Sequence, residues 1–154
     1  MKTKTIVLTV ALCFIAVAVC FAGSSSNMGT WKLNEAKSKF PPMAPKNTTV
    51  VYEAVDDNVK VTVDGTDGEG KPTHNEWTGK FDGKDYPATG PTMPEHVMLT
   101  LKHTGPRSFE MVVKQNGKAL SRDSYRVSQD GRTLTVAGSP IAVNEPYTVV
   151  YEKQ

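Results

Sequence analysis

Cysteine is almost absent from this sequence, since both of its cysteines, Cys13 and Cys20, lie in the N-terminal segment. Residues 23–154 therefore contain no thiol. This excludes disulfide bonds, thiol nucleophiles and thiolate metal sites from that part of the chain. A hydrophobic core must then hold the fold, and a segment of this length can bury roughly two thirds of its unfolded surface in one domain.

Net charge is also lacking. The chain has 18 basic and 16 acidic residues, and without Lys2 and Lys4 the basic count falls to 16. A near-neutral chain lacks the electrostatic footprint of a nucleic-acid partner, so we expect none.

The N-terminal segment is typical of a secretory leader. Its basic start is followed by an apolar run at 6–19 and by small residues before Ala22, a pattern that predicts a signal peptide at 1–22 with cleavage after Ala22. The apolar run is short for a membrane anchor. Lipidation at Cys20 is the remaining alternative. We expect an exported protein, periplasmic or secreted, with no membrane span after cleavage.

Long windows of helical periodicity are missing from 23–154, and apolar residues alternate with period two instead. Val59, Val61 and Val63 share one face, as do Val97, Leu99 and Leu101, and Asn-Gly and Asp-Gly pairs separate such runs. The pairs 82–83, 116–117 and 130–131 favour type I′ hairpins, in which both residues need positive φ. About ten strands are predicted, at 29–33, 47–54, 58–64, 72–81, 84–89, 95–103, 107–115, 118–128, 131–137 and 146–152.

This pattern predicts a single all-β domain over 23–154, an antiparallel meander closed into a barrel. A two-sheet β-sandwich is the alternative. The connection at 35–45 is rich in proline and permits at most one helical turn, capped by Asn34. A turn at 82–83 places Trp77, Phe81 and Tyr86 on one face, with Gly79 leaving room for the Tyr86 ring. These aromatics form either a core cluster or a stacking platform for a ligand.

The stretches GTWKL at 29–33 and VVYEKQ at 149–154 carry a resemblance that runs through the chain. They resemble the first and last strands of the intracellular lipid-binding proteins, the fatty-acid-binding relatives of the lipocalins within the calycin group. The resemblance implies a ten-strand barrel. In that family a helical lid follows the first strand, and two arginines and a tyrosine hold a carboxylate. Here the lid is missing, Tyr151 and Arg126 match, and Val149 stands where the other arginine is expected.

Arg122 and Arg126 could face either way. The hairpin at 116–117 places them inside, whereas the hairpin at 130–131 places Tyr125 and Val127 inside and Arg126 outside. A β-bulge near Asp123 would reconcile the two and is the interpretation we favour, because burying an unpaired charge is costly. A polar-lined interior is the alternative. In the lipocalins a tryptophan at the corresponding position closes one end of the barrel and stacks under an arginine of the last strand. The last strand of this chain offers only Lys153 near its end, so we expect Trp31 to be a packing residue rather than a ligand contact.

The sequence offers few residues that could form a catalytic or metal site. His74 and Glu76 share a face, but a third ligand is not evident, and no serine lies in a nucleophile-elbow context. We therefore expect no enzyme activity, no metal and no cofactor. The predicted function is binding of a small apolar or amphipathic ligand by a monomeric barrel, through Trp77, Phe81, Tyr86, Arg122, Arg126 and Tyr151. The alternative is an envelope structural or interaction module whose interior is packed.

Overall fold

Ten antiparallel strands account for nearly all of the fold. The structure is a computed structural model that describes residues 25–142 and 145–154. The predicted leader at 1–22, with Cys20, lies outside the described residues. The strands are β1 (Gly29–Leu33), β2 (Lys46–Val55), β3 (Asn58–Thr66), β4 (Pro72–Gly79), β5 (Asp82–Thr89), β6 (Val97–Gly105), β7 (Ser108–Gln115), β8 (Lys118–Val127), β9 (Thr133–Pro140) and β10 (Tyr147–Lys153).

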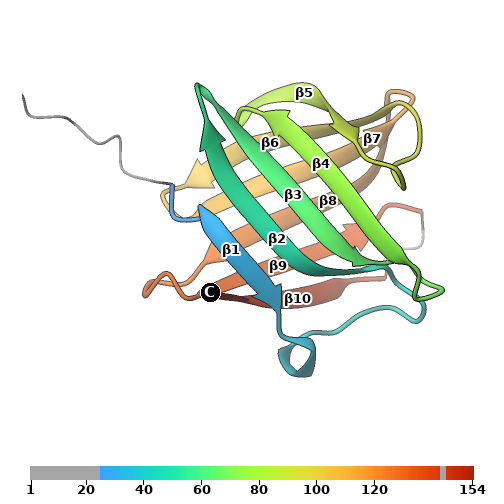
Figure 1. Cartoon of the computed structure of the whole chain (residues 1–154), viewed down its shortest axis with the longest axis horizontal. Helices are drawn as coiled ribbons and strands as arrows, with labels where there is room; N and C mark the ends of the chain where they lie inside the picture. The colour runs from blue at the N-terminus through green and yellow to red at the C-terminus, as the bar shows by residue number, and fades with distance from the viewer. Residues whose placement is uncertain (1–24, 143–144) are drawn as a thin grey trace, which may run out of the picture.

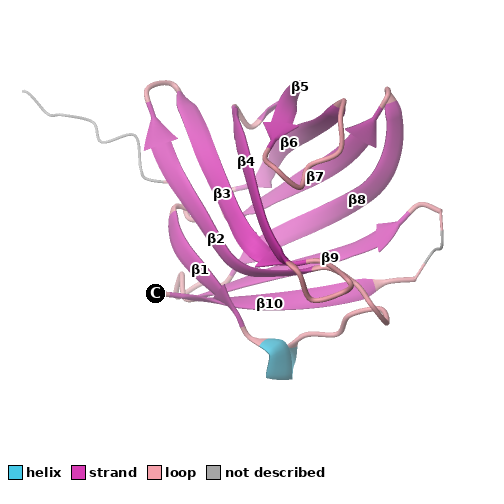
Figure 2. Ribbon diagram, turned by 45° about the vertical axis from the view of Figure 1, so that its right-hand side comes forward, coloured by secondary structure: helices cyan, strands magenta, loops and turns pink. Residues whose placement is uncertain are grey.

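Each strand pairs with the next along the chain, and β1 also pairs with β10, which closes the sheet into a barrel (Figure 1). Closure gives every strand two neighbours, although β4 and β5 share only two residue pairs. The predicted all-β meander and barrel are confirmed, and the β-sandwich alternative is not the fold found. The turned view in Figure 2 shows the strands wrapping around the interior.

The alternating residues point as the sequence predicts. Val61, Leu101 and Phe109 are buried inside the barrel, and Val59, Val63 and Leu99 pack against this core. The outer residues of the same strands, such as Lys102, are exposed. Period-two patterning is therefore what fixes the inner face of each strand.

Trp31 closes the barrel interior near the N-terminal end of the described chain. Its side chain is fully buried, and its indole Nε1 donates a hydrogen bond to the Asn27 carbonyl oxygen at 2.7 Å. The Lys153 ammonium lies 5.2 Å from the indole centroid, in cation–π range. Trp31 is thus a packing residue of the core, as predicted, whereas the contact with Lys153 is a finding of the structure.

The connection after β1 contains one short 3₁₀ turn, η1 (Glu35–Lys37). The Asn34 side chain caps it by accepting a hydrogen bond from the Lys37 amide, as predicted. Beyond η1, Lys39 exchanges two backbone hydrogen bonds with Thr148. The connection is thereby held against β10, beside which it lies in Figure 1.

The predicted hairpin turns are only partly correct. Asn116 and Gly117 both have positive φ, 49° and 77°, as a type I′ turn requires. Gly83 instead lies within β5, although Trp77 still pairs with Ala88 as predicted. At the third pair, positive φ is found at Gly131 and not at Asp130.

A bulge in β8 settles the orientation of the two arginines. Val113 pairs with Ser121 but Lys114 pairs with Ala119, so Leu120 is the extra residue. The predicted bulge exists, three positions earlier than expected. Because it resets the alternation, Arg122 and Arg126 are exposed on the outer face, with an Arg122 nitrogen 4.0 Å from the Glu110 carboxylate.

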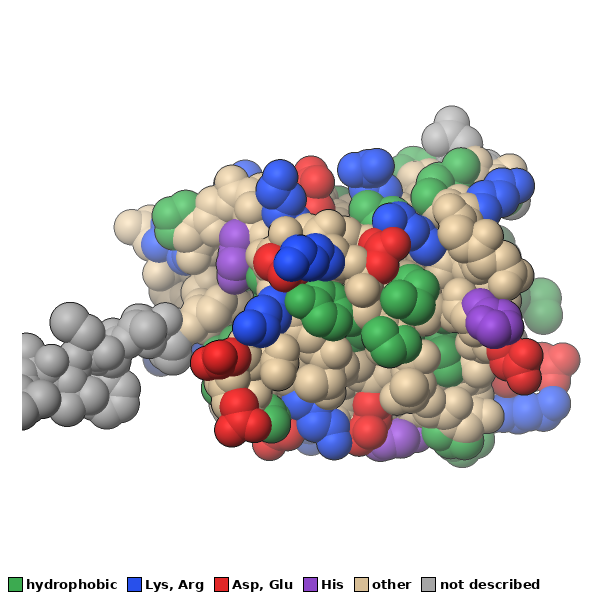
Figure 3. Space-filling model, turned by 90° about the horizontal axis from the view of Figure 1, so that it is seen from above, with side chains coloured by type: hydrophobic (Ala, Val, Ile, Leu, Met, Phe, Trp, Pro, Cys, Tyr) green, Lys and Arg blue, Asp and Glu red, His purple; other side chains and the backbone are tan. Residues whose placement is uncertain are grey.

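The outer surface carries charges of both signs. Lysine, arginine and acidic side chains are interspersed on the face drawn in Figure 3. Several charged side chains of the described residues form ion pairs, such as Lys60 with Glu76 at 2.7 Å. Among the described residues, the structure contains no helix with the length and apolar character needed to cross a membrane.

Candidate ligand-binding site

The barrel interior is hollow, with two adjoining cavities. The first, which we call the Trp77 cavity, measures about 260 Å³, and the second, the Asp123 cavity, about 300 Å³. Both are lined by the same five residues where they adjoin: Asn47, Met111, Val113, Tyr125 and Tyr151. A molecule inside the barrel can therefore extend from one cavity toward the other.

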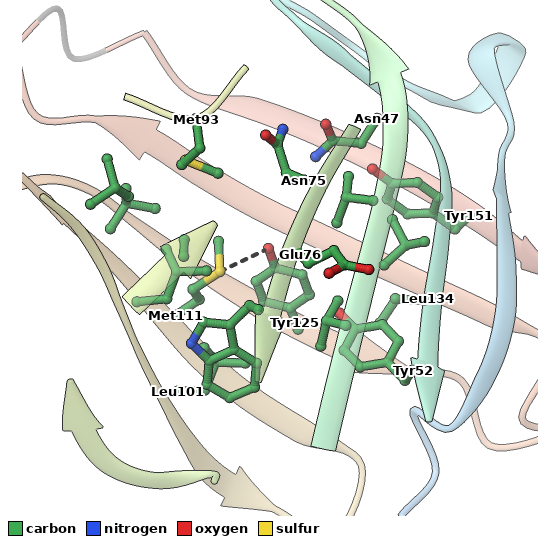
Figure 4. Close-up of a pocket in the computed structure, with 18 residues that line it drawn as sticks. Asn47, Tyr52, Asn75, Glu76, Met93, Leu101, Met111, Tyr125, Leu134 and Tyr151 are labelled. Carbon is green, nitrogen blue, oxygen red and sulfur yellow. Dashed lines mark hydrogen bonds between the residues drawn. The ribbon is translucent and has the colours of Figure 1, made fainter. Parts of the chain in front are cut away.

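The Trp77 cavity has mostly apolar walls. Val61, Leu101 and Leu134 contribute side chains from different sides of the barrel, and Trp77 forms part of the wall. Figure 4 shows Leu101, Met111 and Leu134 among the tyrosines of this cavity. Such walls favour an apolar group of the ligand.

The predicted aromatic face is a core cluster. Phe81 and Tyr86 both contact Trp77 edge to face, with ring centroids 6.1 Å and 5.9 Å from the indole. A Cβ on Gly79 would lie 2.6 Å from the Tyr86 ring, so glycine does leave room for it. Trp77 lines the cavity, whereas Phe81 and Tyr86 are not among its lining residues and support the indole instead.

Of the remaining predicted site residues, the tyrosine lines the cavities and the two arginines do not. Tyr151 is buried and lines both cavities, and its role in ligand binding stays a prediction. Arg122 and Arg126 line neither, because the bulge turns them outward. Their assignment to an interior binding site is therefore corrected, and the carboxylate grip implied by the family resemblance has no arginine inside this barrel.

An aspartate occupies the interior instead. Asp123 follows Arg122 on β8, points inward and is 3% exposed. The Tyr147 hydroxyl donates a hydrogen bond to Asp123 Oδ1, and the Ser121 hydroxyl donates one to Oδ2 at 3.2 Å. All three side chains line the Asp123 cavity.

Burial dominates the electrostatics of Asp123. Loss of solvent raises the pKa of this carboxyl, and the hydrogen bonds from Tyr147 and Ser121 oppose that rise only in part. Within 25–142 and 145–154, no lysine, arginine or histidine forms an ion pair with Asp123. The interior thus holds an acid without a basic protein partner.

Asp123 is not among the predicted site residues, although its inward position can be read from the sequence. The hairpin at 130–131 places Val127 and Tyr125 inside, and continuing that alternation by two residues reaches Asp123. We expected the bulge at that position, which interrupted the pattern. The actual bulge at Leu120 leaves the alternation intact from Ser121 to Val127.

Tyrosine hydroxyls add further polar groups to the cavity walls. Tyr52, Tyr125 and Tyr151 line the Trp77 cavity (Figure 4), and burial raises the pKa of each phenol. They therefore remain protonated at neutral pH and can donate hydrogen bonds. The Tyr125 hydroxyl lies 3.7 Å from the Met111 sulfur.

The proline-rich connection forms one wall of the Asp123 cavity. Phe40, Pro41, Ala44 and Pro45 all line it, on the side held against β10. This segment is the connection that follows β1. It therefore belongs to the site, a role that the sequence pattern did not reveal.

The three histidines lie outside both cavities. His74, His96 and His103 are exposed, and none lines either cavity. His74 Nδ1 lies 2.6 Å from the Asp64 carboxylate on the surface, and its Nε2 lies 3.9 Å from Glu76. The part of the chain that the structure describes contains no group of three or more histidine, cysteine or acidic residues that could hold a metal ion.

Comparisons with known proteins find similarity in structure alone. No family model matches this chain, and its sequence has no significant match among curated proteins. A de novo designed fluorescence-activating β-barrel is similar to 82% of this chain and 93% of its own, with a TM-score of 0.44 and 10% identity. A biogenic amine-binding protein is similar over 82% of this chain and 62% of its own, with a TM-score of 0.39 and 12% identity. At such low similarity, neither protein indicates what this chain does.

Proposed function

We propose that the protein binds one small amphipathic molecule inside its barrel and performs no catalysis. The observation that carries this proposal is the pair of adjoining cavities of about 260 and 300 Å³. Ligand sites typically measure about 300–1,000 Å³. The two cavities together therefore fall within the size range of sites for one small molecule.

The composition of the walls supports an amphipathic ligand. Apolar side chains surround the Trp77 cavity, while Tyr151, Asn47 and Asp123 offer polar atoms around the second cavity. A few fixed polar groups in an apolar cavity orient a ligand while burial supplies affinity. A packed interior, as in the structural-module alternative, would leave no such space.

We further propose that binding takes place after export. The leader predicted at 1–22 supports this, with cleavage after Ala22 or lipidation at Cys20 as the two routes. The absence of thiols from 23–154 and the exposure of all three histidines support a binding protein over a thiol- or histidine-dependent enzyme.

Native mass spectrometry of the exported protein, followed by a thermal-shift screen of small amphipathic molecules, tests the proposal. We expect a retained ligand mass or a stabilised melting transition. The variant Val113→Phe should abolish either signal, because Val113 lines both cavities. The matched control Val112→Phe should leave it unchanged, because Val112 pairs with the outward-facing Arg122.

One combination of results would contradict this function. A ligand-free mass, no thermal shift with any compound, and identical behaviour of the wild type and both variants would indicate a barrel that carries nothing. The structural-module alternative would then be favoured.

A further inference from the structure

The Asp123 carboxylate has unused hydrogen-bonding capacity inside a cavity. A carboxylate can accept about four hydrogen bonds. Tyr147 and Ser121 supply one each, to different oxygens, and the described residues supply no other side-chain donor. Because Asp123 lines the cavity, its remaining acceptor positions are available to a molecule placed there.

Among the residues that the structure describes, none places a positive charge beside Asp123. Met111 faces it from β7, Gly138 from β9 and Tyr147 from β10, while Phe40 lines the same cavity from the connection. The titratable groups facing this space are Tyr125, Tyr147 and Tyr151, all of them phenols with raised pKa. Burying a carboxylate without a counter-ion is costly, and a cation beside it reduces that cost.

From this geometry we propose that the ligand carries a protonated amine, which binds Asp123 as its counter-ion. This inference rests on the proposed function, because it names the chemical class of the molecule that occupies the same interior. The ammonium would donate hydrogen bonds to the remaining acceptor positions of the Asp123 carboxylate. The apolar part of the ligand would extend into the Trp77 cavity.

Aromatic residues around Asp123 suit the same class of ligand. Phe40, Tyr125, Tyr147 and Tyr151 all line the Asp123 cavity. Aromatic faces attract ammonium groups, with a larger effect where water is excluded. An anionic ligand would meet the opposite situation, because the buried carboxylate would repel it.

Three probes of nearly equal size test whether the charge of the ligand or its shape decides the affinity. Phenethylamine carries a cation, phenethyl alcohol is neutral, and phenylpropionate carries an anion on a similar arylalkyl frame. Isothermal titration calorimetry on the mature protein at about neutral pH should show the amine binding most tightly. We expect the alcohol to bind about 10- to 100-fold more weakly, as for loss of a charge-assisted hydrogen bond, and the acid not to bind.

The variant Asp123→Asn tests the assigned residue. It keeps the size and an acceptor for Tyr147 but removes the charge, so phenethylamine affinity should fall about 10- to 100-fold to that of the alcohol. Glu110→Gln is the matched control, because it removes the same charge from the outer face of the neighbouring strand. It should leave all three affinities unchanged.

The outcomes distinguish this inference from the function on which it rests. Equal binding of amine and alcohol, or unchanged amine affinity in Asp123→Asn, overturns the amine inference and leaves ligand binding supported. Absence of amine binding also overturns the inference, and ligand binding is then decided by the thermal-shift screen. Circular dichroism and a cooperative melt of Asp123→Asn would establish that lost affinity is not lost folding.

Discussion

Asp123 and Gly138 lie opposite each other on β8 and β9, and the carboxylate of one fills the space that a side chain of the other would need. A Cβ built on Gly138 would lie 2.0 Å from Asp123 Oδ1 and 2.9 Å from the Tyr147 ring. The bare backbone at Gly138 therefore lets the aspartate and the tyrosine meet inside the barrel.

Gly138→Ala should destabilise the fold by about 1–3 kcal/mol, the usual cost of overpacking a tight interior. Glycine to alanine at an unstrained strand position would ordinarily be neutral or stabilising. Urea unfolding of the wild type and the variant measures the difference. In an Asp123→Ser background the same change should cost less, since the clashing carboxylate is gone. Strictly additive effects in this cycle would place the clash elsewhere.

The stability of the protein should depend on pH through Asp123. Burial raises the folded-state pKa above 3.8, so the stabilising contribution of the protonated acid is present below that value and is lost as pH rises through the folded pKa. Asp123→Asn cannot ionise. Its free energy of unfolding relative to wild type should therefore improve as the pH rises from about 4 through the folded-state pKa of Asp123.

Denaturant unfolding of the two ligand-free proteins across this range provides the measurement. Glu110→Gln, which changes an exposed carboxylate, serves as the reference for general charge effects. A stability difference between Asp123→Asn and wild type that stays flat with pH would show that Asp123 does not titrate there.

Tyr147→Phe should raise the pKa of Asp123 further. The Tyr147 hydroxyl donates to the ionised carboxylate, and this hydrogen bond lowers the pKa against the larger effect of burial. A ¹³C NMR titration of the Asp123 carboxyl carbon measures the shift directly. Tyr125→Phe is the control, because the Tyr125 hydroxyl contacts the Met111 sulfur and not Asp123. A lowered or unchanged Asp123 pKa in Tyr147→Phe would contradict the assigned hydrogen bond.

The barrel could be predicted from local patterns because strand alternation is a local property. Because side chains alternate along a strand, the spacing of Val59, Val61 and Val63 is enough to put them on one face. At 82–83 the register is as predicted, with Trp77 opposite Ala88. Gly83 lies in β5 because Asp82 pairs with Lys102 of β6, a contact between strands that the residue preferences of the turn do not report.

The interior site depends on relationships that a single strand does not contain. One extra residue at Leu120 decides that Asp123, and not Arg122, faces inward. Cavity volume is set by side chains from many strands together, so no local pattern reports it. Phe40 joins the site because Lys39 is bonded to Thr148, a contact between segments distant in the chain.

Tryptophan fluorescence should report ligand binding through Trp77 alone. The chain has two tryptophans. Trp77 lines a cavity, and its buried indole N–H has no hydrogen-bond partner among the described residues, so a bound molecule changes its surroundings. Trp31 lines neither cavity and already donates to Asn27.

Two single-tryptophan variants separate these signals. In Trp31→Phe, which retains Trp77, emission should shift or change in intensity as the bound probe saturates, with the dissociation constant found by calorimetry. In Trp77→Phe, which retains Trp31, emission should stay constant even where calorimetry still detects binding. Equal changes in both variants would mean that binding alters the whole barrel. A change seen only in Trp77→Phe would mean that the ligand binds near Trp31 and not in the Trp77 cavity.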